Sequence, residues 1–218
     1  PSHLKGVRPK SLTTKRLKDM AAVNICESTI KRDIAFDCEQ LSVRGLEADG
    51  VIINRSDIDF AATVFDETQK NIIKTLVLKS GKKGYQVAQL GSTPFTGTQT
   101  TLNVGKYRNT WTHQIPLAVL ANDPDVCNDV IDGLANGQFV VIIRNKQKAN
   151  KGEYQVYGYA QGLTASEGTN DKYSEDTDGG WLITLQEVST PKCALLYYNT
   201  DDKTTATQFA SLTTAASS

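Results

Sequence analysis

Apolar and polar residues alternate over much of this chain, as they do in strands that bury one face. The pattern begins near residue 23 and is clear over 58–64, where every second side chain is apolar. Further strands are expected over 72–79 and 85–90. Glycines open and close the intervening Gly81–Gly84 segment and favour a tight turn, so the sequence predicts a β-hairpin there.

The second half of the chain continues the strand pattern. Strands are expected over 98–104, 109–119, 139–143, 154–160, 181–188 and 193–198. Pro116 lacks a backbone N–H and indicates an edge or bent strand. The Thr-rich segment 93–101 leads into one of these strands and is a candidate contact loop, whereas the Gly-, Ser-, Thr- and Asp-rich residues 164–180 predict a long polar loop.

One segment, 123–136, has the period of an amphipathic helix. Asn122 or Asp123 can cap it, and Pro124 suits its first turn. Gly137 is expected to end it in the left-handed conformation. Its apolar stripe consists of Val126, Cys127, Val130, Ile131 and Leu134. The spacing predicts a helix that packs against a sheet.

These elements predict a mainly-β fold, a β-sandwich or barrel with one flanking α-helix, long loops and an extended N-terminal arm. Within the 218 residues we expect a basic arm over 1–20 and a single β-sandwich-type domain over 21–199, which includes the helix 123–136. A C-terminal tail over 200–218 is expected to contain a short helix and a frayed end.

Charge is balanced overall but not along the chain. Lys and Arg number 24, as do Asp and Glu, which argues against a chain that coats nucleic acid. Six basic residues precede the first acid, Asp19: Lys5, Arg8, Lys10, Lys15, Arg16 and Lys18. Four acids lie close together near the end of the polar loop: Asp171, Glu175, Asp176 and Asp178. We expect the arm to dock on this loop of a neighbouring copy; phosphate binding by the arm is the alternative, although no aromatics interleave it.

Residues for catalysis are scarce, and we expect no enzyme. Only His3 and His113 could serve as imidazole bases, and alternation next to Trp111 gives His113 a structural explanation. The acidic loop could bind Ca²⁺, but its spacing does not match an EF-hand. No glycine-rich nucleotide motif occurs, so no cofactor or metal is expected.

The remaining composition limits the compartment. The cysteines Cys26, Cys38, Cys127 and Cys193 form no CxxC pair and are expected to be free, mostly buried thiols in a reducing cytoplasm. The purest apolar run, 139–143, is far shorter than the roughly 18 residues of a membrane span, so no membrane association is expected.

Residues 106–199 resemble bacteriophage tail structural proteins of the tail tube, major tail protein or tail connector ring type, as in phages of gut Bacteroides. The resemblance follows an order of elements that starts at Asn109-Thr-Trp-Thr-His-Gln-Ile-Pro-Leu and passes through a helix ending in Leu134-Ala-Asn-Gly137. Gln138-Phe-Val-Val-Ile-Ile and Glu153-Tyr-Gln-Val-Tyr-Gly-Tyr-Ala-Gln-Gly-Leu163 follow, and Asp178-Gly-Gly-Trp-Leu-Ile-Thr-Leu185 is similar to the final strand of that family. No single motif is diagnostic.

The resemblance implies a non-enzymatic virion protein, assembled in the host cytoplasm. Its sheets would join between copies into a homo-oligomeric ring, a hexamer or a multiple of six, through which DNA passes without specific binding. Other tail or portal-proximal proteins would be its partners. The strongly basic N-terminus departs from the pattern and leaves a repeating tube subunit and a single connector ring both open.

Two other classes of function remain as alternatives. A glycan- or receptor-binding β-sandwich would expose aromatics on one face, and its candidates are Tyr154, Tyr157, Tyr159, Tyr173, Tyr197 and Tyr198. A β-sandwich hydrolase would need a carboxylate pair on facing strands, whereas most acids here fall in turns.

Overall fold

The computed structural model of the protein describes residues 30–34 and 43–216. The chain divides into two units, Pro1–Asp33 and Ile34–Ser218, and every helix and strand described belongs to the second. The predicted basic arm over 1–20 lies outside the described residues. The compact unit begins at Ile34 rather than at residue 21 and extends beyond residue 199.

Two β-sheets form the second unit, which confirms the mainly-β prediction. One sheet has seven strands in the order β2-β3-β11-β8-β7-β1-β4. These are β1 (Leu46–Asn54), β2 (Val64–Phe65), β3 (Ile72–Thr75), β4 (Tyr85–Ala88), β7 (Phe139–Asn145), β8 (Tyr154–Tyr157) and β11 (Leu195–Tyr197). The other has four strands in the order β5-β6-β10-β9: β5 (Gln99–Asn103), β6 (Thr110–Val119), β9 (Thr164–Thr169) and β10 (Trp181–Thr190).

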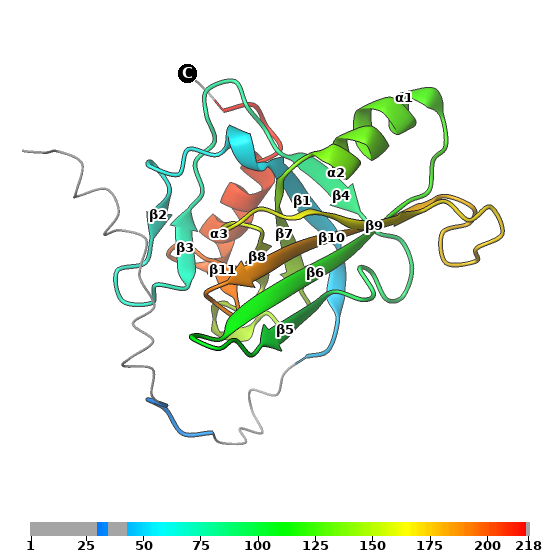
Figure 1. The fold of residues 1–218 in the computed structure, drawn as a ribbon. Helices are drawn as coiled ribbons and strands as arrows, with labels where there is room; N and C mark the ends of the chain where they lie inside the picture. The colour runs from blue at the N-terminus through cyan, green and yellow to red at the C-terminus, as the bar shows by residue number, and fades with distance from the viewer. Residues whose placement is uncertain (1–29, 35–42, 217–218) are drawn as a thin grey trace, which may run out of the picture. The chain divides into compact units, whose positions relative to one another are not determined.

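Helices flank the sheets. The predicted helix is present as α1 (Pro124–Val126), a π-helical turn (Cys127–Ile131) and α2 (Asp132–Asn136). Near the C-terminus lies α3 (Asp202–Ser211), and short 3₁₀ turns occupy Arg55–Asp57 and Ala149–Lys151. The four-stranded sheet crosses in front of the seven-stranded sheet (Figure 1).

The seven-stranded sheet is buried on both faces at its centre, because it separates two apolar cores. On β1, Ile52 belongs to the core shared with the four-stranded sheet, whereas Val51 and Ile53 belong to the core beneath α3. Strand β7 alternates in the same way, with Val141 in the first core and Val140 in the second. This explains why residues 139–143 form an unbroken apolar run.

The first helix begins as the sequence predicts but ends differently. The Asp123 side chain accepts a hydrogen bond from Val126 N at 3.0 Å and caps it. The π turn changes the angular spacing of the side chains, and Val130 is exposed although it was predicted in the apolar stripe. Gly137 is extended, not left-handed, and a Cβ there would lie 2.3 Å from the Phe139 ring. Close packing therefore explains this glycine.

The predicted hairpin over 72–90 is wrong. Strand β3 pairs with β2 and β11, while β4 pairs with β1 at the other edge of the sheet. The 81–84 turn instead pairs with the C-terminal segment: Gly84 N donates to Leu212 O at 2.7 Å, and Gly81 N donates to Ala216 O at 2.9 Å. The strand predicted over 58–64 is also absent apart from Val64, the first residue of β2, because Asp59 caps a turn by accepting from Ala61 N and Ala62 N.

The predicted C-terminal tail over 200–218 is corrected in the same way. Helix α3 is present, but it supplies Phe209 to the core beneath the large sheet, as does Leu212 just after it. The Phe209 ring packs on Tyr154, with ring centroids 4.8 Å apart. Residues 200–216 are thus part of the folded unit.

Candidate assembly surfaces

The four-stranded sheet has two open edges and almost no charge. Strands β5 and β9 each pair on one side only within the described residues. None of the four strands contains Lys or Arg, and their only carboxylates are Glu167 and Glu187. An open edge presents unpaired backbone N–H and C=O groups, which a strand of another chain can satisfy.

Uncharged polar side chains dominate the outer face of this sheet. Gln99 lies opposite Gln114, and their amides are 3.4 Å apart from nitrogen to oxygen. Asn103 Nδ2 donates to Thr112 Oγ1 at 2.5 Å on the same strand pair. The exposed Leu182 and Val188 of β10 interrupt this polar surface. The sheet thus offers a hydrated wall with little electrostatic attraction for anions or cations.

Strand β9 lies inside the region predicted as a loop. Its sequence, Thr-Ala-Ser-Glu-Gly-Thr, is polar and mostly exposed, so alternation is nearly absent. It nevertheless pairs along β10, for example Thr169 with Leu182. Only Ala165 of this strand packs against the core between the sheets. An edge strand with a single inward apolar side chain carries too weak a pattern to be predicted.

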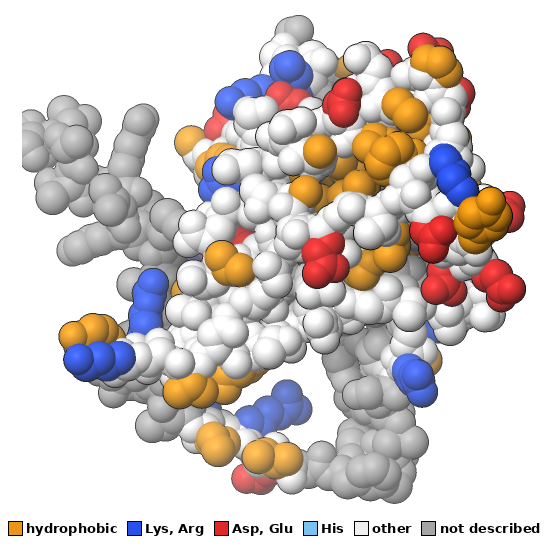
Figure 2. All heavy atoms as spheres, turned by 45° about the vertical axis from the view of Figure 1, so that its right-hand side comes forward, with side chains coloured by type: hydrophobic (Ala, Val, Ile, Leu, Met, Phe, Trp, Pro, Cys, Tyr) orange, Lys and Arg blue, Asp and Glu red, His pale blue; other side chains and the backbone are white. Residues whose placement is uncertain are grey.

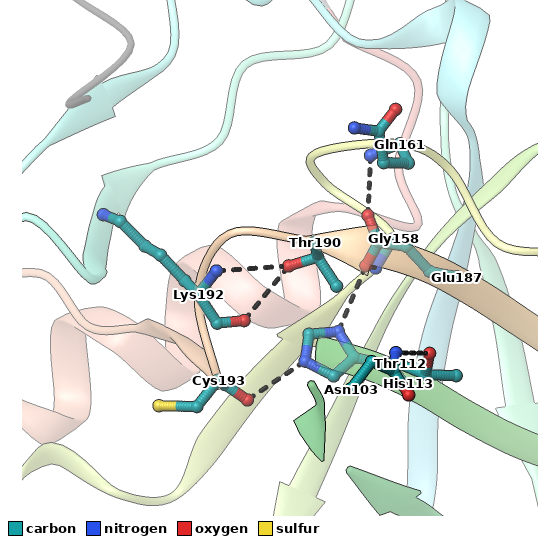
Figure 3. Close-up of polar contacts among 9 residues, drawn as sticks. All are labelled: Asn103, Thr112, His113, Gly158, Gln161, Glu187, Thr190, Lys192 and Cys193. Carbon is teal, nitrogen blue, oxygen red and sulfur yellow. Dashed lines mark hydrogen bonds and ion pairs between the residues drawn. The ribbon is translucent and has the colours of Figure 1, made fainter. Parts of the chain in front are cut away.

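A buried polar network fixes one end of the four-stranded sheet (Figure 3). His113 on β6 and Glu187 on β10 are only 3% and 2% exposed, and His113 Nδ1 lies 3.1 Å from Glu187 Oε2. Glu187 also accepts from Gly158 N at 3.0 Å and Gln161 N at 2.6 Å. The carboxylate therefore ties β10 to β6 and to the β8–β9 connection.

Both ring nitrogens of His113 have an oxygen partner. Nε2 lies 3.0 Å from the backbone oxygen of Cys193, which can only accept, and Nδ1 faces the Glu187 side chain. Burial by itself raises the pKa of Glu187, but hydrogen bonds from His113 and the Gln161 amide outweigh it and hold the pKa below its ordinary value.

Glu187 was not among the residues predicted from the sequence. One signal could have found it, because Glu187 shares the parity of Ile183 and Leu185, whose side chains are buried between the sheets. A carboxylate on the inward face of a strand needs a buried partner. His113, on the inward face of a neighbouring strand, is that partner, and its contacts are those of a structural residue.

The predicted contact residues are only partly described. Asp171, Glu175, Asp176 and Asp178 lie together in the β9–β10 loop, 170–180, and all are exposed. The loop is anchored by Thr177, which is buried, and by Asn170 Nδ2, which donates to Gly180 O at 2.7 Å. The six basic residues of the predicted partner arm lie outside the described residues.

The six tyrosines do not form a glycan-binding face. Tyr154, Tyr157 and Tyr197 are buried in the two cores, and burial raises the pKa of each. Tyr173 stands alone at the tip of the β9–β10 loop. This removes the main sequence argument for the glycan-binding alternative.

A shallow groove of about 450 Å³ runs beside β9 and β10. Its lining includes Thr164, Ser166, Gln186 and Val188, with no ionisable side chain among them. Among the described residues, no three His, Cys, Asp or Glu side chains gather closely enough to hold a metal ion. The groove therefore presents hydroxyls and amides but no cluster typical of catalysis.

Known proteins add no identification. No family model, curated protein or solved structure matches the chain.

Two smaller findings concern the cysteines and the helices. Cys127 and Cys193 are free, as predicted; Cys127 is half-buried, whereas Cys193 is exposed and departs from the expectation of buried thiols. Cys26 and Cys38 lie outside the described residues. No helix in the described part of the chain is long and apolar enough to cross a membrane.

Proposed function

We propose that this chain is a non-enzymatic structural subunit of a bacteriophage tail, which forms a ring in a tail tube or head–tail connector. The observation that carries the proposal is the four-stranded sheet with open edges β5 and β9 and no Lys or Arg in any strand. Copies join edge to edge, so that β5 of one subunit extends the sheet of the next through β9. A head-to-tail interface of this kind closes into a ring when the rotation permits.

The charge pattern supports a channel wall. DNA binds proteins mainly through contacts between phosphates and Lys or Arg. A wall built from the outer faces of these sheets presents Gln, Thr and Asn, with Glu167 as its exposed carboxylate. Such a wall lets a polyanion pass without holding it.

The remaining parts of the proposal follow from the resemblance. The ring is a hexamer or a multiple of six, it assembles in the host cytoplasm, and it resides in the virion tail. Other tail or portal-proximal proteins contact its ends. The basic N-terminal arm serves these protein contacts.

The experiment is the mass of the purified full chain in solution, followed by negative-stain imaging of the larger species. We expect rings. The variant Thr101→Lys/Asn103→Lys places two lysines on the β5 edge, where lysine opposes edge-to-edge pairing, and is expected to give monomers. The matched control, Ala206→Lys/Thr207→Lys, adds the same charges to the exposed face of α3 and is expected to form rings. A wild-type chain that stays monomeric at high concentration contradicts the proposal.

A further inference from the structure

The β9–β10 loop carries an exposed aromatic ring among acids that form no ion pair within the described residues. Tyr173 is 95% exposed, the most exposed aromatic side chain of the described residues. The backbone N–H of Tyr173 donates to Asp171 Oδ1 at 3.0 Å, which forms a turn in the loop. None of the four acids of the loop forms an ion pair within the described ranges, and Lys172 reaches away to Asn122 Oδ1 at 3.1 Å. Figure 2 shows several acidic side chains around a hydrophobic group at its right.

A second surface has the complementary composition. Tyr159 lies between Phe60 and Phe65, with ring centroids 5.2 and 5.4 Å away and both contacts edge-on. The guanidinium carbon of Arg55 lies 4.7 Å from the Phe60 centroid, and Lys192 Nζ lies 6.0 Å from the Phe65 centroid. We call these five residues the aromatic patch. Phe60 is 39% exposed, and the neighbouring Val64 is exposed as well.

The cations of the aromatic patch also lack carboxylate partners. Neither Arg55 nor Lys192 forms an ion pair within residues 30–34 and 43–216, and Arg55 Nε is buried without a hydrogen-bond partner. Lys192 Nζ donates to the backbone oxygen of Lys70. Burial and the nearby charge of Lys70 lower the pKa of Lys192, so an approaching carboxylate would relieve an unfavourable environment.

The two surfaces lie at opposite ends of the folded unit. The acidic loop directly precedes β10, and Lys192 follows its last residue, Thr190. A strand of ten residues is roughly 30 Å long. Figure 1 shows the same separation, with β2 and β3 on the left and the β9–β10 loop on the right. The surfaces therefore cannot meet within one copy.

We propose that the β9–β10 loop of one copy docks on the aromatic patch of the next copy, with Tyr173 packed against the exposed rings and the loop acids paired with Arg55, Lys70 and Lys192. This contact lies at the ends of the strands and is separate from the lateral β5–β9 edges. It joins copies end to end and stacks one ring on another. The inference rests on the proposed function, because it names the surface through which the rings stack.

Two variants test the contact. The loop variant Tyr173→Ala/Asp176→Lys removes the ring and reverses one charge, and the patch variant Phe60→Ala/Lys70→Glu does the same on the other surface. Each is expected to leave single rings intact and to raise the concentration needed for stacking by at least about tenfold, the effect of losing one interface hot spot. Circular dichroism and melting temperature should match the wild type, since all four side chains are exposed.

Mixing the two variants makes the test directional. A ring of the loop variant keeps an intact patch, and a ring of the patch variant keeps intact loops. The mixture is therefore expected to give paired rings but no longer stacks, which sedimentation velocity and negative-stain images can count. Paired rings absent from the mixture would overturn the proposal.

Matched controls remove similar groups elsewhere. Tyr107 is 88% exposed, and Lys83 Nζ lies 5.8 Å from the Tyr85 centroid, an aromatic–lysine pair outside the patch. Stacking should be unchanged in Tyr107→Ala and in Tyr85→Ala/Lys83→Glu.

Wild-type rings that do not stack, or a patch variant that stacks normally, would overturn this inference but not the proposed function. If the patch variant still stacks and deletion of residues 1–18 abolishes stacking, the binding partner of the β9–β10 loop is the N-terminal arm and not the aromatic patch. A monomeric wild type would contradict both proposals.

Discussion

The carboxylate of Glu187 on β10 lies 3.1 Å from the imidazole of His113 on β6, in the interior of the four-stranded sheet. The same carboxylate accepts two backbone N–H groups from the β8–β9 connection. The pair thus joins the sheet that carries the proposed wall to the segment that carries Tyr159. We regard it as the polar element that fixes the position of the sheet.

Replacing Glu187 with Gln should destabilise the fold strongly. The amide carries no negative charge towards His113, and its NH₂ group would face a backbone N–H donor. Removal of one partner from a buried pair costs about 3–5 kcal/mol. Urea unfolding of Glu187→Gln should show this loss, whereas Glu167→Gln, on exposed β9, should stay within about 0.5 kcal/mol of the wild type. If Glu187→Gln changed the unfolding free energy as little as Glu167→Gln, the His113–Glu187 pair would contribute nothing to stability.

Lowering the pH should remove the stabilisation that the His113–Glu187 pair contributes to the fold. The pKa of Glu187 is lower in the folded chain than its ordinary value of 4.5, so its ionisation stabilises the fold above that pH. The stabilisation is lost as pH falls through the folded-state pKa. The difference in unfolding free energy between the wild type and Glu187→Gln should therefore shrink as the pH falls from about 5 towards 3. A difference that persists unchanged to pH 3 would contradict this linkage.

The C-terminal helix should be required for stability. Phe209 is buried against Tyr154, and truncation of a buried Phe to Ala typically costs about 3–5 kcal/mol. Phe209→Ala is expected to lower the unfolding free energy by that amount. Lys203→Ala, on the exposed side of the same helix, should change it by less than about 0.5 kcal/mol. A stable chain truncated after Asn199 would show that the C-terminal segment is the tail that the sequence alone predicts.

Local signals explain which parts of the fold could be predicted. The helix starting at Pro124 has its own cap in Asp123, and β7 is apolar because layers cover both of its faces. The hairpin prediction failed because the partner of the 81–84 turn is the C-terminal segment, which is more than 120 residues away along the chain. Sequence patterns report burial and local turns, but not which distant backbone satisfies them.

The candidate surfaces were predictable to a smaller degree. The acids of the β9–β10 loop stand out in the sequence by charge alone. The aromatic patch does not, because Phe60 and Tyr159 come from segments a hundred residues apart and meet only through the pairing of the large sheet. The open edges β5 and β9 also depend on strand order, which alternation does not encode.

Replacing each of two glycines with alanine should change the stability of the fold in opposite directions. A Cβ on Gly50 of β1 would lie 2.9 Å from Ile142 O on the paired strand β7, so Gly50→Ala forces the strands apart. Overpacking of this kind costs about 1–3 kcal/mol. Gly133 in α2 has no atom within 4 Å of such a Cβ, and Gly133→Ala should stabilise the helix by about 0.5–1 kcal/mol. Thermal melting of both variants checks the pair. If Gly50→Ala left the melting temperature unchanged, β1 and β7 would be able to separate without cost. The central pairing of the seven-stranded sheet would then be looser than the 2.9 Å approach to Ile142 O implies.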